Sequence, residues 1–162
     1  MQIQTRITQI AAQINADYAD KNILLLCTLK GAYLFMADLS RQLTPPTEID
    51  FIKISSYGSS TQASDITFDF PPTTNLQGRH VLLIEDIVDT GHSMAFLRKY
   101  IESQNPASLK VCALLDKPER REVAIPPCEY LGFSIPNKFV IGYGLDYDQR
   151  YRNLPYIGVL EN

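Results

Sequence analysis

The chain has 162 residues, 45% of them hydrophobic, with a formal net charge of −3 and a pI near 5.3. This length and apolar content suit one domain with a well-filled core. No run of lysine or arginine interrupts the acidic balance, which argues against a nucleic-acid partner and against an anionic membrane surface. A small-molecule partner is therefore expected.

Two further features indicate a cytoplasmic protein. The first residues lack a basic-then-apolar leader, and the longest apolar run, Ile23 to Cys27, is too short to span a bilayer. Cys27, Cys112 and Cys128 form no CxxC pair, so neither a metal site nor a disulfide framework is indicated. We expect three core or near-core thiols.

The first half of the chain alternates between helical and strand-like patterns. Apolar spacing over 7–18 predicts a helix, and the apolar run 22–28 predicts a strand buried on both faces. Helical periodicity returns over 32–43 and ends at two prolines. Residues 48–55 then alternate polar and apolar, as a half-exposed strand does.

The second half continues this alternation with a strand at 81–84, a helix with apolar residues over 94–101 and a strand at 109–115. The pattern predicts an α/β fold with a central, mostly parallel sheet flanked by helices. Prolines and glycines interrupt the tail. We therefore expect a single domain with a core over about 1–125 and a small hood over about 126–162.

The strand at 81–84 runs directly into an acidic and hydroxyl-rich loop, and a helix follows. Ligands bind at the carboxyl ends of strands in open α/β sheets. Asp89 to Ser93 offers hydroxyls, a glycine and free N–H groups at a helix N-terminus, which suit a phosphate. Glu85 and Asp86 could hold a vicinal diol or magnesium-bound water. A phosphate beside a diol describes a phosphorylated ribose.

The competing interpretations of this loop are simpler. Asp89, Thr90 and Ser93 could merely cap the helix, although capping does not explain the two preceding acids. No GxxxxGK[ST] motif exists, and the segment 142–147 lacks the third glycine of a dinucleotide loop. A nucleoside triphosphatase and a dehydrogenase are thus disfavoured.

Residues 81–93, Val-Leu-Leu-Ile-Glu-Asp-Ile-Val-Asp-Thr-Gly-His-Ser, resemble the phosphoribosyl diphosphate (PRPP) motif of type I phosphoribosyltransferases. Four other segments resemble hypoxanthine-guanine phosphoribosyltransferases in order and approximate spacing: 27–33, 56–57, 115–117 and 138–152. The resemblance covers nearly the whole chain. It implies transfer from PRPP to a 6-oxopurine, giving IMP or GMP and diphosphate, with Mg²⁺ as cofactor and a homodimer or homotetramer as assembly.

The resemblance also implies roles on the phosphate side. Asp89 matches the candidate general base at purine N7. Glu85 and Asp86 match the residues that face the ribose hydroxyls and the metal. The 5-phosphate loop continues through Thr90, Gly91, His92 and Ser93, with backbone N–H groups rather than the imidazole as donors. The diphosphate site comprises Leu29, Lys30, Gly31 and Arg152, with a non-proline cis peptide before the lysine.

On the purine side, Lys117 matches a donor to the exocyclic O6, which would select hypoxanthine or guanine over adenine. Phe139 matches the ring that stacks on the base, and the Val140 backbone reads its edge. Asp146 matches a magnesium ligand, with Asp148 as the alternative. Without the resemblance, Lys117 would be a surface charge and Phe139 a core residue.

The polar stretch 57–65 is either a slack surface loop or a lid, and Ser56 and Tyr57 match lid residues of the family. Three other functions compete: the same enzyme with xanthine or adenine as base, a regulator on this fold that binds PRPP or RNA, and an oligomeric scaffold. The acidic pI and the joint match of the acid pair, Asp89, Lys117 and Phe139 argue against the regulator. A scaffold would not need acids and hydroxyls clustered at one strand end.

Overall fold

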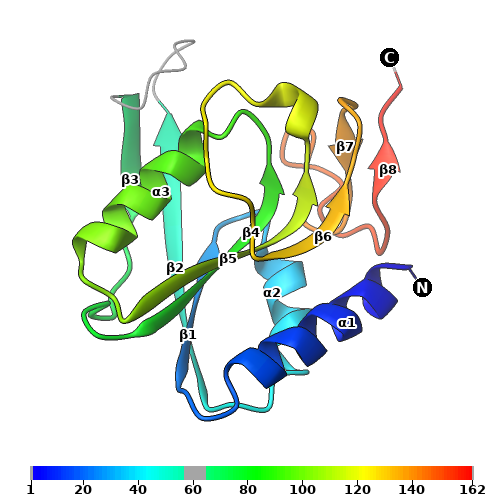
Figure 1. Cartoon of the computed structure of the whole chain (residues 1–162). Helices are drawn as coiled ribbons and strands as arrows, with labels where there is room; N and C mark the ends of the chain where they lie inside the picture. Colours follow the sequence, from blue (N-terminus) through cyan, green and yellow to red (C-terminus); the bar gives the residue numbers. More distant parts are fainter. Residues whose placement is uncertain (1, 57–64, 162) are drawn as a thin grey trace.

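The computed structural model describes residues 2–56 and 65–161 (Figure 1). Its helices are α1 (Gln2–Asp17), α2 (Tyr33–Ser40) and α3 (His92–Ser103), with a short 3-10 turn at Pro118–Arg120. Its strands are β1 (Ile23–Thr28), β2 (Thr47–Ser56), β3 (Ile66–Phe70), β4 (His80–Val88), β5 (Ser108–Asp116), β6 (Tyr130–Ser134), β7 (Val140–Ile141) and β8 (Gly158–Val159).

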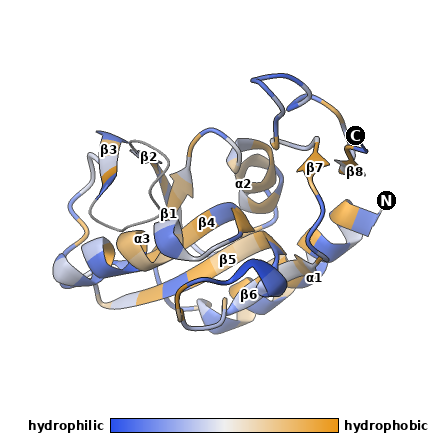
Figure 2. Cartoon of the chain, turned by 90° about the horizontal axis from the view of Figure 1, so that it is seen from above, coloured by the Kyte–Doolittle hydropathy of each residue, from blue (hydrophilic) through white to orange (hydrophobic). Residues whose placement is uncertain are grey.

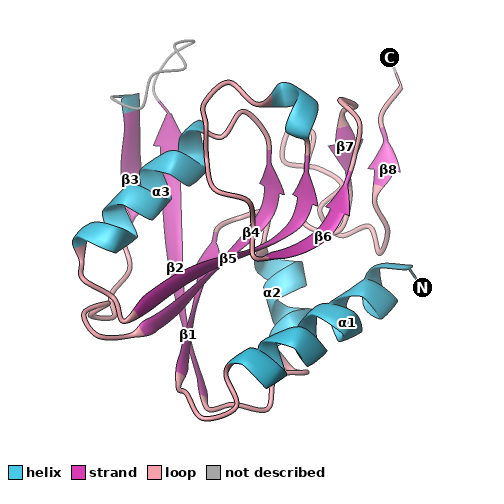
Figure 3. Cartoon of the chain, viewed as in Figure 1, coloured by secondary structure: helices cyan, strands magenta, loops and turns pink. Residues whose placement is uncertain are grey.

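Six strands form the central sheet in the order β3-β2-β1-β4-β5-β6. The neighbours from β2 to β6 pair in parallel, and β3 joins β2 antiparallel at one edge. The expected mostly parallel sheet with flanking helices is confirmed (Figure 3). The strand order reverses between β1 and β4. The strand that follows β1 in the chain, β2, pairs with one side of β1, and the later strand β4 pairs with its other side.

Helices cover both faces of the sheet. One core cluster joins α1 and α2 to the sheet through residues such as Ile10, Phe35 and Leu25. The other joins α3 to the opposite face through Leu97 and Leu83. Apolar residues accordingly concentrate in the strands, as the orange of β4 and β5 shows (Figure 2). Every residue of β1 is buried, as the continuous apolar run predicted.

Two element ends differ from the sequence prediction. Helix α2 ends at Ser40 rather than Leu43, and Arg41 follows as its C-cap. Strand β4 extends beyond the apolar run to Val88, because its pairing with β5 continues as far as Val88 and Asp116. Glu85 and Asp86 therefore lie within strand β4, where pairing with β5 fixes the backbone.

The tail divides into two parts. Strand β6 pairs with β5 inside the central sheet, and the connection between them holds only the 3-10 turn. The antiparallel pair β7–β8 forms a separate two-stranded sheet beside β6 (Figure 1). From here on, the hood means this pair and the segment that joins its strands, residues 139–160, and no longer includes β6.

The thiols lie where the sequence placed them, with Cys27 and Cys112 buried and Cys128 half-buried. In the described part of the chain, no helix combines the length and apolar character needed to cross a bilayer.

Candidate active site

The carboxyl ends of β1 and β4 meet at the point where the strand order reverses, the usual ligand position in such sheets. Thr28 Oγ1 donates to Glu85 Oε1 at 2.6 Å, and the Asp86 N–H donates to the same oxygen at 3.1 Å. Burial and the adjacent Asp86 carboxylate raise the pKa of Glu85 well above its ordinary value. A hydroxyl-rich ligand or a cation here would offset the repulsion between these acids.

Gly31 is clamped between strand β4 and the hood. A Cβ at Gly31 would lie 1.7 Å from Asp86 Oδ2, and a Cβ at Gly144 would lie 2.0 Å from the Gly31 carbonyl oxygen. Gly144 also has a φ of 100°, which side-chain-bearing residues rarely adopt. Neither position has room for a side chain, so the loop after β1 touches Asp86 on one side and the hood on the other.

The loop after β1 also carries Lys30, whose ammonium group contacts the hood. The Leu29–Lys30 peptide is cis, as the family resemblance implies. Lys30 Nζ donates to Gln149 Oε1 at 3.0 Å, and Arg152 donates to the same oxygen at 3.3 Å. Arg152 also pairs with Asp146 Oδ1 at 3.2 Å. Two cations thus converge on one neutral oxygen, an arrangement suited to binding an anion.

The loop between β4 and α3 leaves the helix N-terminus open. The N-cap is Gly91, with a φ of 95°, and among the described side chains none caps the first turn. Asp89, Thr90 and Ser93 are therefore not helix caps. A cavity of about 80 Å³ lies here, lined by Glu85, Ile87, Val88, Asp89, Thr90, Gly91, Ser93 and Met94. Free N–H groups and the helix dipole favour an anion in this cavity.

The segment after β5 folds over this loop. The Glu122 N–H donates to the Thr90 carbonyl at 2.9 Å, and His92 Nε2 lies 2.9 Å from Glu122 Oε2. Arg121 donates to the Asp89 carbonyl oxygen. The imidazole of His92 is thus turned toward Glu122 and does not line the cavity. Its contact fixes the loop, while the backbone remains available to a ligand.

Lys117 follows β5 and is only 7% exposed. Its N–H donates to the Val88 carbonyl at 2.9 Å, which holds it next to the strand end that carries Asp89. Within residues 2–56 and 65–161, its ammonium forms neither an ion pair nor a hydrogen bond. The fully enclosed side-chain atoms without a partner in the described structure are Tyr18 Oη and Arg98 Nε, so the Lys117 ammonium keeps some contact with solvent and can receive an acceptor from a ligand.

Asp89 forms an ion pair with Arg120, with Nε 3.0 Å from Oδ1. The side chains are 41% and 43% exposed, respectively, and exposed pairs contribute little to stability. A ligand could therefore take the place of Arg120 at small cost. Asp89 also lines the cavity at α3, and its chain neighbour Val88 accepts from the Lys117 N–H, so both features adjoin the same strand end.

Phe139 is 51% exposed at the start of the hood. Its ring contacts the ring of Tyr147 in an edge-to-face arrangement, with the ring centroids 5.8 Å apart and the ring planes at 86°. The Phe139 carbonyl accepts from Leu160 N–H at 2.9 Å, and Val140 begins β7. An exposed aromatic ring held in this way can stack on a planar ligand.

The contacts of the remaining candidate residues say less about a role in binding. Ser56 is the exposed last residue of β2, and Tyr57 lies in the segment 57–64, outside the described residues. Asp146 is half-buried and accepts from the Gln149 N–H at 2.9 Å, whereas Asp148 is exposed. No cluster of three metal-ligating side chains occurs in the described ranges. A cation here would need ligands from its substrate as well.

Sequence reasoning missed Thr28, Arg120 and Gln149. Thr28 had a usable signal, because it ends a buried strand at the ligand-binding edge of the predicted sheet. Arg120 and Gln149 had none, since they contact residues 31 and 119 positions away in the chain.

Comparison with known proteins gives one consistent result. Residues 1–148 match the family model described as the phosphoribosyl transferase domain. The chain is 45% identical over 160 residues to hypoxanthine phosphoribosyltransferase of Haemophilus influenzae, covering 96% of this chain and 89% of the relative. It is also 45% identical over 167 residues to hypoxanthine-guanine phosphoribosyltransferase of Mycobacterium tuberculosis, covering 99% and 82%.

The solved structures agree. A hypoxanthine-guanine phosphoribosyltransferase from Bacillus anthracis, with a HEPES molecule in its active site, superposes with a TM-score of 0.95 at 40% identity, covering 99% of this chain and 94% of that one. A ternary substrate complex of hypoxanthine phosphoribosyltransferase from Trypanosoma cruzi gives a TM-score of 0.94 at 40% identity, covering 99% and 91%. These relatives are matched over nearly their whole length.

Proposed function

The chain belongs to the phosphoribosyltransferase family, and we propose that it is a purine salvage enzyme, which transfers the 5-phosphoribosyl group from PRPP to hypoxanthine or guanine. The products are IMP or GMP and diphosphate. Relatives and solved structures that bear this name, at 40–45% identity over nearly the full chain, support the proposal.

The observation that carries the choice of base is the ammonium of Lys117, a largely buried residue whose ammonium has no partner among the described residues. This group can only donate hydrogen bonds, so it favours a base with a carbonyl oxygen over one with an amino group at the same position. A site built around such a donor rejects a ligand that leaves it unpaired. Hypoxanthine and guanine carry the required oxygen, and adenine does not.

The purine would lie between Lys117 and the exposed ring of Phe139, with the Val140 backbone at its edge. Asp89 would take or share the N7 proton as the glycosidic bond forms, displacing Arg120 from its carboxylate. The 5-phosphate would occupy the 80 Å³ cavity at the start of α3, bound by backbone N–H groups of residues 89–93.

The ribose hydroxyls would face Glu85 and Asp86, and the diphosphate would be bound by Lys30, the Gly31 backbone and Arg152. We propose Mg²⁺ as cofactor, because carboxylates that share a metal with substrate phosphates are its usual ligands. Since Glu85, Asp86 and Asp146 form no joint cluster in the described structure, each would help to hold it only together with substrate oxygens, and when bound it would neutralise charge on the departing diphosphate.

We further propose a cytoplasmic enzyme that assembles as a homodimer or homotetramer. The three free cysteines of the structure suit a reducing compartment. The assembly follows from the family resemblance.

The test of the proposed function is release of diphosphate from PRPP and Mg²⁺ with hypoxanthine, guanine, xanthine or adenine added singly. Release with the first two bases is expected. In the control Asp89→Asn, turnover should fall by about 100-fold or more while PRPP binding changes little, as for loss of a general base. Equal losses of turnover and binding would refute the base role. No release with any base would favour a regulator that binds PRPP without turnover.

A further inference from the structure

The hood turn Tyr147–Arg150 has an unusual backbone. Tyr147 and Arg150 exchange N–H to carbonyl hydrogen bonds of 3.1 and 3.0 Å, and the central residues, Asp148 and Gln149, have φ values of 50° and 62°. Two-residue turns with both central residues in the left-handed region normally use asparagine or glycine there. Glutamine does not favour this conformation, and Tyr143 and Tyr151 nearby also adopt it, with φ values of 51° and 73°. The contacts of the Gln149 side chain, rather than its backbone, therefore indicate its role.

That side chain joins the two cations of the diphosphate site. Gln149 Oε1 accepts from Lys30 at 3.0 Å and from Arg152 at 3.3 Å. Arg152 is itself fixed by the Gly144 carbonyl at 2.7 Å, and the Gln149 N–H is fixed by Asp146 at 2.9 Å. The turn therefore places one neutral oxygen at the point that both positive groups can reach.

Resting on the function proposed above, we propose that Gln149 is a positioning residue for PRPP. It holds Lys30 and Arg152 together before the substrate arrives, then yields its place between them to a diphosphate oxygen. Without Gln149, Lys30 would be repelled by Arg152 and would sample many rotamers, and ordering its side chain on binding would weaken affinity. A neutral amide binds cations more weakly than a phosphate oxygen does, so the substrate can displace it.

The absence of charge on Gln149 is what permits this exchange. A carboxylate at the same position would form two ion pairs with Lys30 and Arg152 and would compete with the diphosphate. Removal of the side chain would instead leave Lys30 without this partner, while Arg152 keeps its contacts with the Gly144 carbonyl and Asp146. The proposal therefore predicts that both changes weaken PRPP binding, the carboxylate more strongly.

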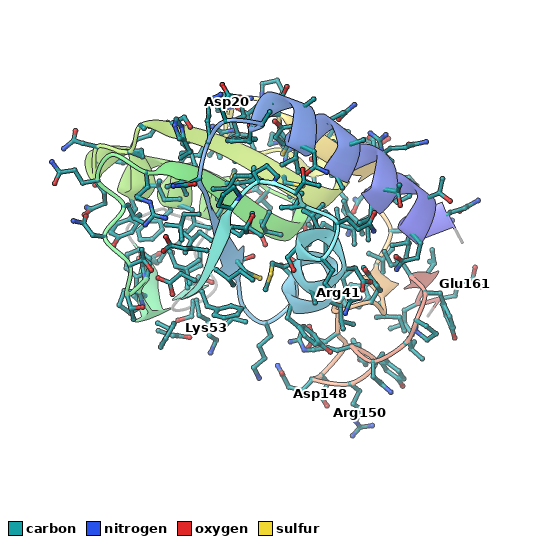
Figure 4. The ribbon with its side chains drawn as sticks, turned by 90° about the horizontal axis from the view of Figure 1, so that it is seen from below. Asp20, Arg41, Lys53, Asp148, Arg150 and Glu161 are labelled. Carbon is teal, nitrogen blue, oxygen red and sulfur yellow. The ribbon has the colours of Figure 1, made fainter. Side chains whose placement is uncertain are left out.

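The experiment compares Gln149→Glu, Gln149→Gly and the control Arg150→Gln by their KM for PRPP, their KM for hypoxanthine and their kcat. Arg150 lies in the same turn, is exposed and points away from the body of the protein (Figure 4), and its change alters the charge by the same single unit as Gln149→Glu. A calorimetric titration of each folded protein with inorganic diphosphate and Mg²⁺ gives a readout that needs no turnover.

Gln149→Glu should raise the KM for PRPP by about tenfold or more, with kcat at saturation and the KM for hypoxanthine within about twofold of wild type. Gln149→Gly should raise it by about three- to tenfold while the melting temperature stays equal or rises, because glycine adopts the positive φ without strain. Diphosphate affinity should fall in parallel in both variants. Arg150→Gln should stay within about twofold of wild type, as its charge is solvent-screened.

The inference is overturned if Gln149→Glu leaves the KM for PRPP unchanged, if Gln149→Gly lowers it, or if kcat and both KM values change together. These results differ from a failure of the proposed function, in which wild-type protein shows no turnover with any base. In that case the diphosphate titration still decides whether Gln149 positions the two cations.

Discussion

The position of Lys117 allows a prediction in which activity changes and stability does not. Lys117→Met keeps a side chain of similar length, largely buried as in the 7% exposed lysine, and removes an ammonium that has no partner among the described residues. A hydrogen bond from a charged donor contributes about 1.5–3 kcal/mol, so kcat/KM for hypoxanthine should fall about 10- to 150-fold. Discrimination against adenine should weaken as well.

The same change should leave the stability of the fold nearly unchanged. The ammonium is not among the fully enclosed unpartnered atoms of the described structure, so its removal relieves no buried polar group, and the melting temperature should stay within about 2 °C of wild type. The assays are IMP formation by absorbance and thermal unfolding by circular dichroism, with Lys99→Met on the exposed side of α3 as control. Loss of less than about threefold in kcat/KM, or a melting temperature changed by more than about 5 °C, would refute the reasoning.

Three further predictions concern the framework of the site. Burial acts to raise the pKa of Asp50, but N–H donors from Thr74, Phe51 and Thr73 outweigh it and leave the pKa below its ordinary value. Its stabilisation is therefore present above pH ~3.9 and lost as the pH falls through the lower folded pKa. At pH 6, urea unfolding should give a free energy of unfolding about 1–3 kcal/mol lower for Asp50→Asn than for wild type. A difference between the two proteins that did not narrow toward pH ~3 would contradict this explanation. Burial and the hydrogen bond to Asp38 raise the pKa of Tyr143, so its contribution is present below pH ~10 and lost as the pH rises further. Tyr143→Phe should cost about 0.5–1.5 kcal/mol at pH 8 by the same measurement, and no change would show that the contact does not hold the hood. Gly144→Ala should raise the KM for PRPP by about tenfold or more, because its Cβ would meet the Gly31 carbonyl at 2.0 Å; an unaltered KM in a steady-state assay would mean that the clamp on Gly31 is dispensable.

Much of the fold could be predicted because its patterns are local. The apolar run that became β1 and the helical spacing of α1 and α3 are readable without tertiary knowledge. Strand β4 extended beyond its apolar run because pairing with β5, a long-range contact, continued through the acidic residues. Strand β6 was not anticipated, since five residues between prolines carry little periodic signal.

The candidate site divides in the same way. Residues 85–93, the end of β4 and the loop after it, were recognisable because one contiguous segment carries the acids, hydroxyls and glycine. The burial of Lys117 could not be seen, because its surroundings are charged and proline-rich and only the pairing of β4 with β5 draws it inward. The contact between Lys30 and Gln149 joins loops that the chain separates by 119 positions, and no spacing rule predicts it.

The most direct test of the account is a competition in one reaction. Wild-type protein, PRPP and Mg²⁺ are incubated with equimolar hypoxanthine, guanine, xanthine and adenine, and the nucleotides formed are identified by mass spectrometry. Because Lys117 donates to a 6-oxo group, which adenine lacks, we expect 6-oxopurine nucleotides, IMP and GMP among them, as the main products and little AMP. AMP as the main product, or no nucleotide at all, would contradict it.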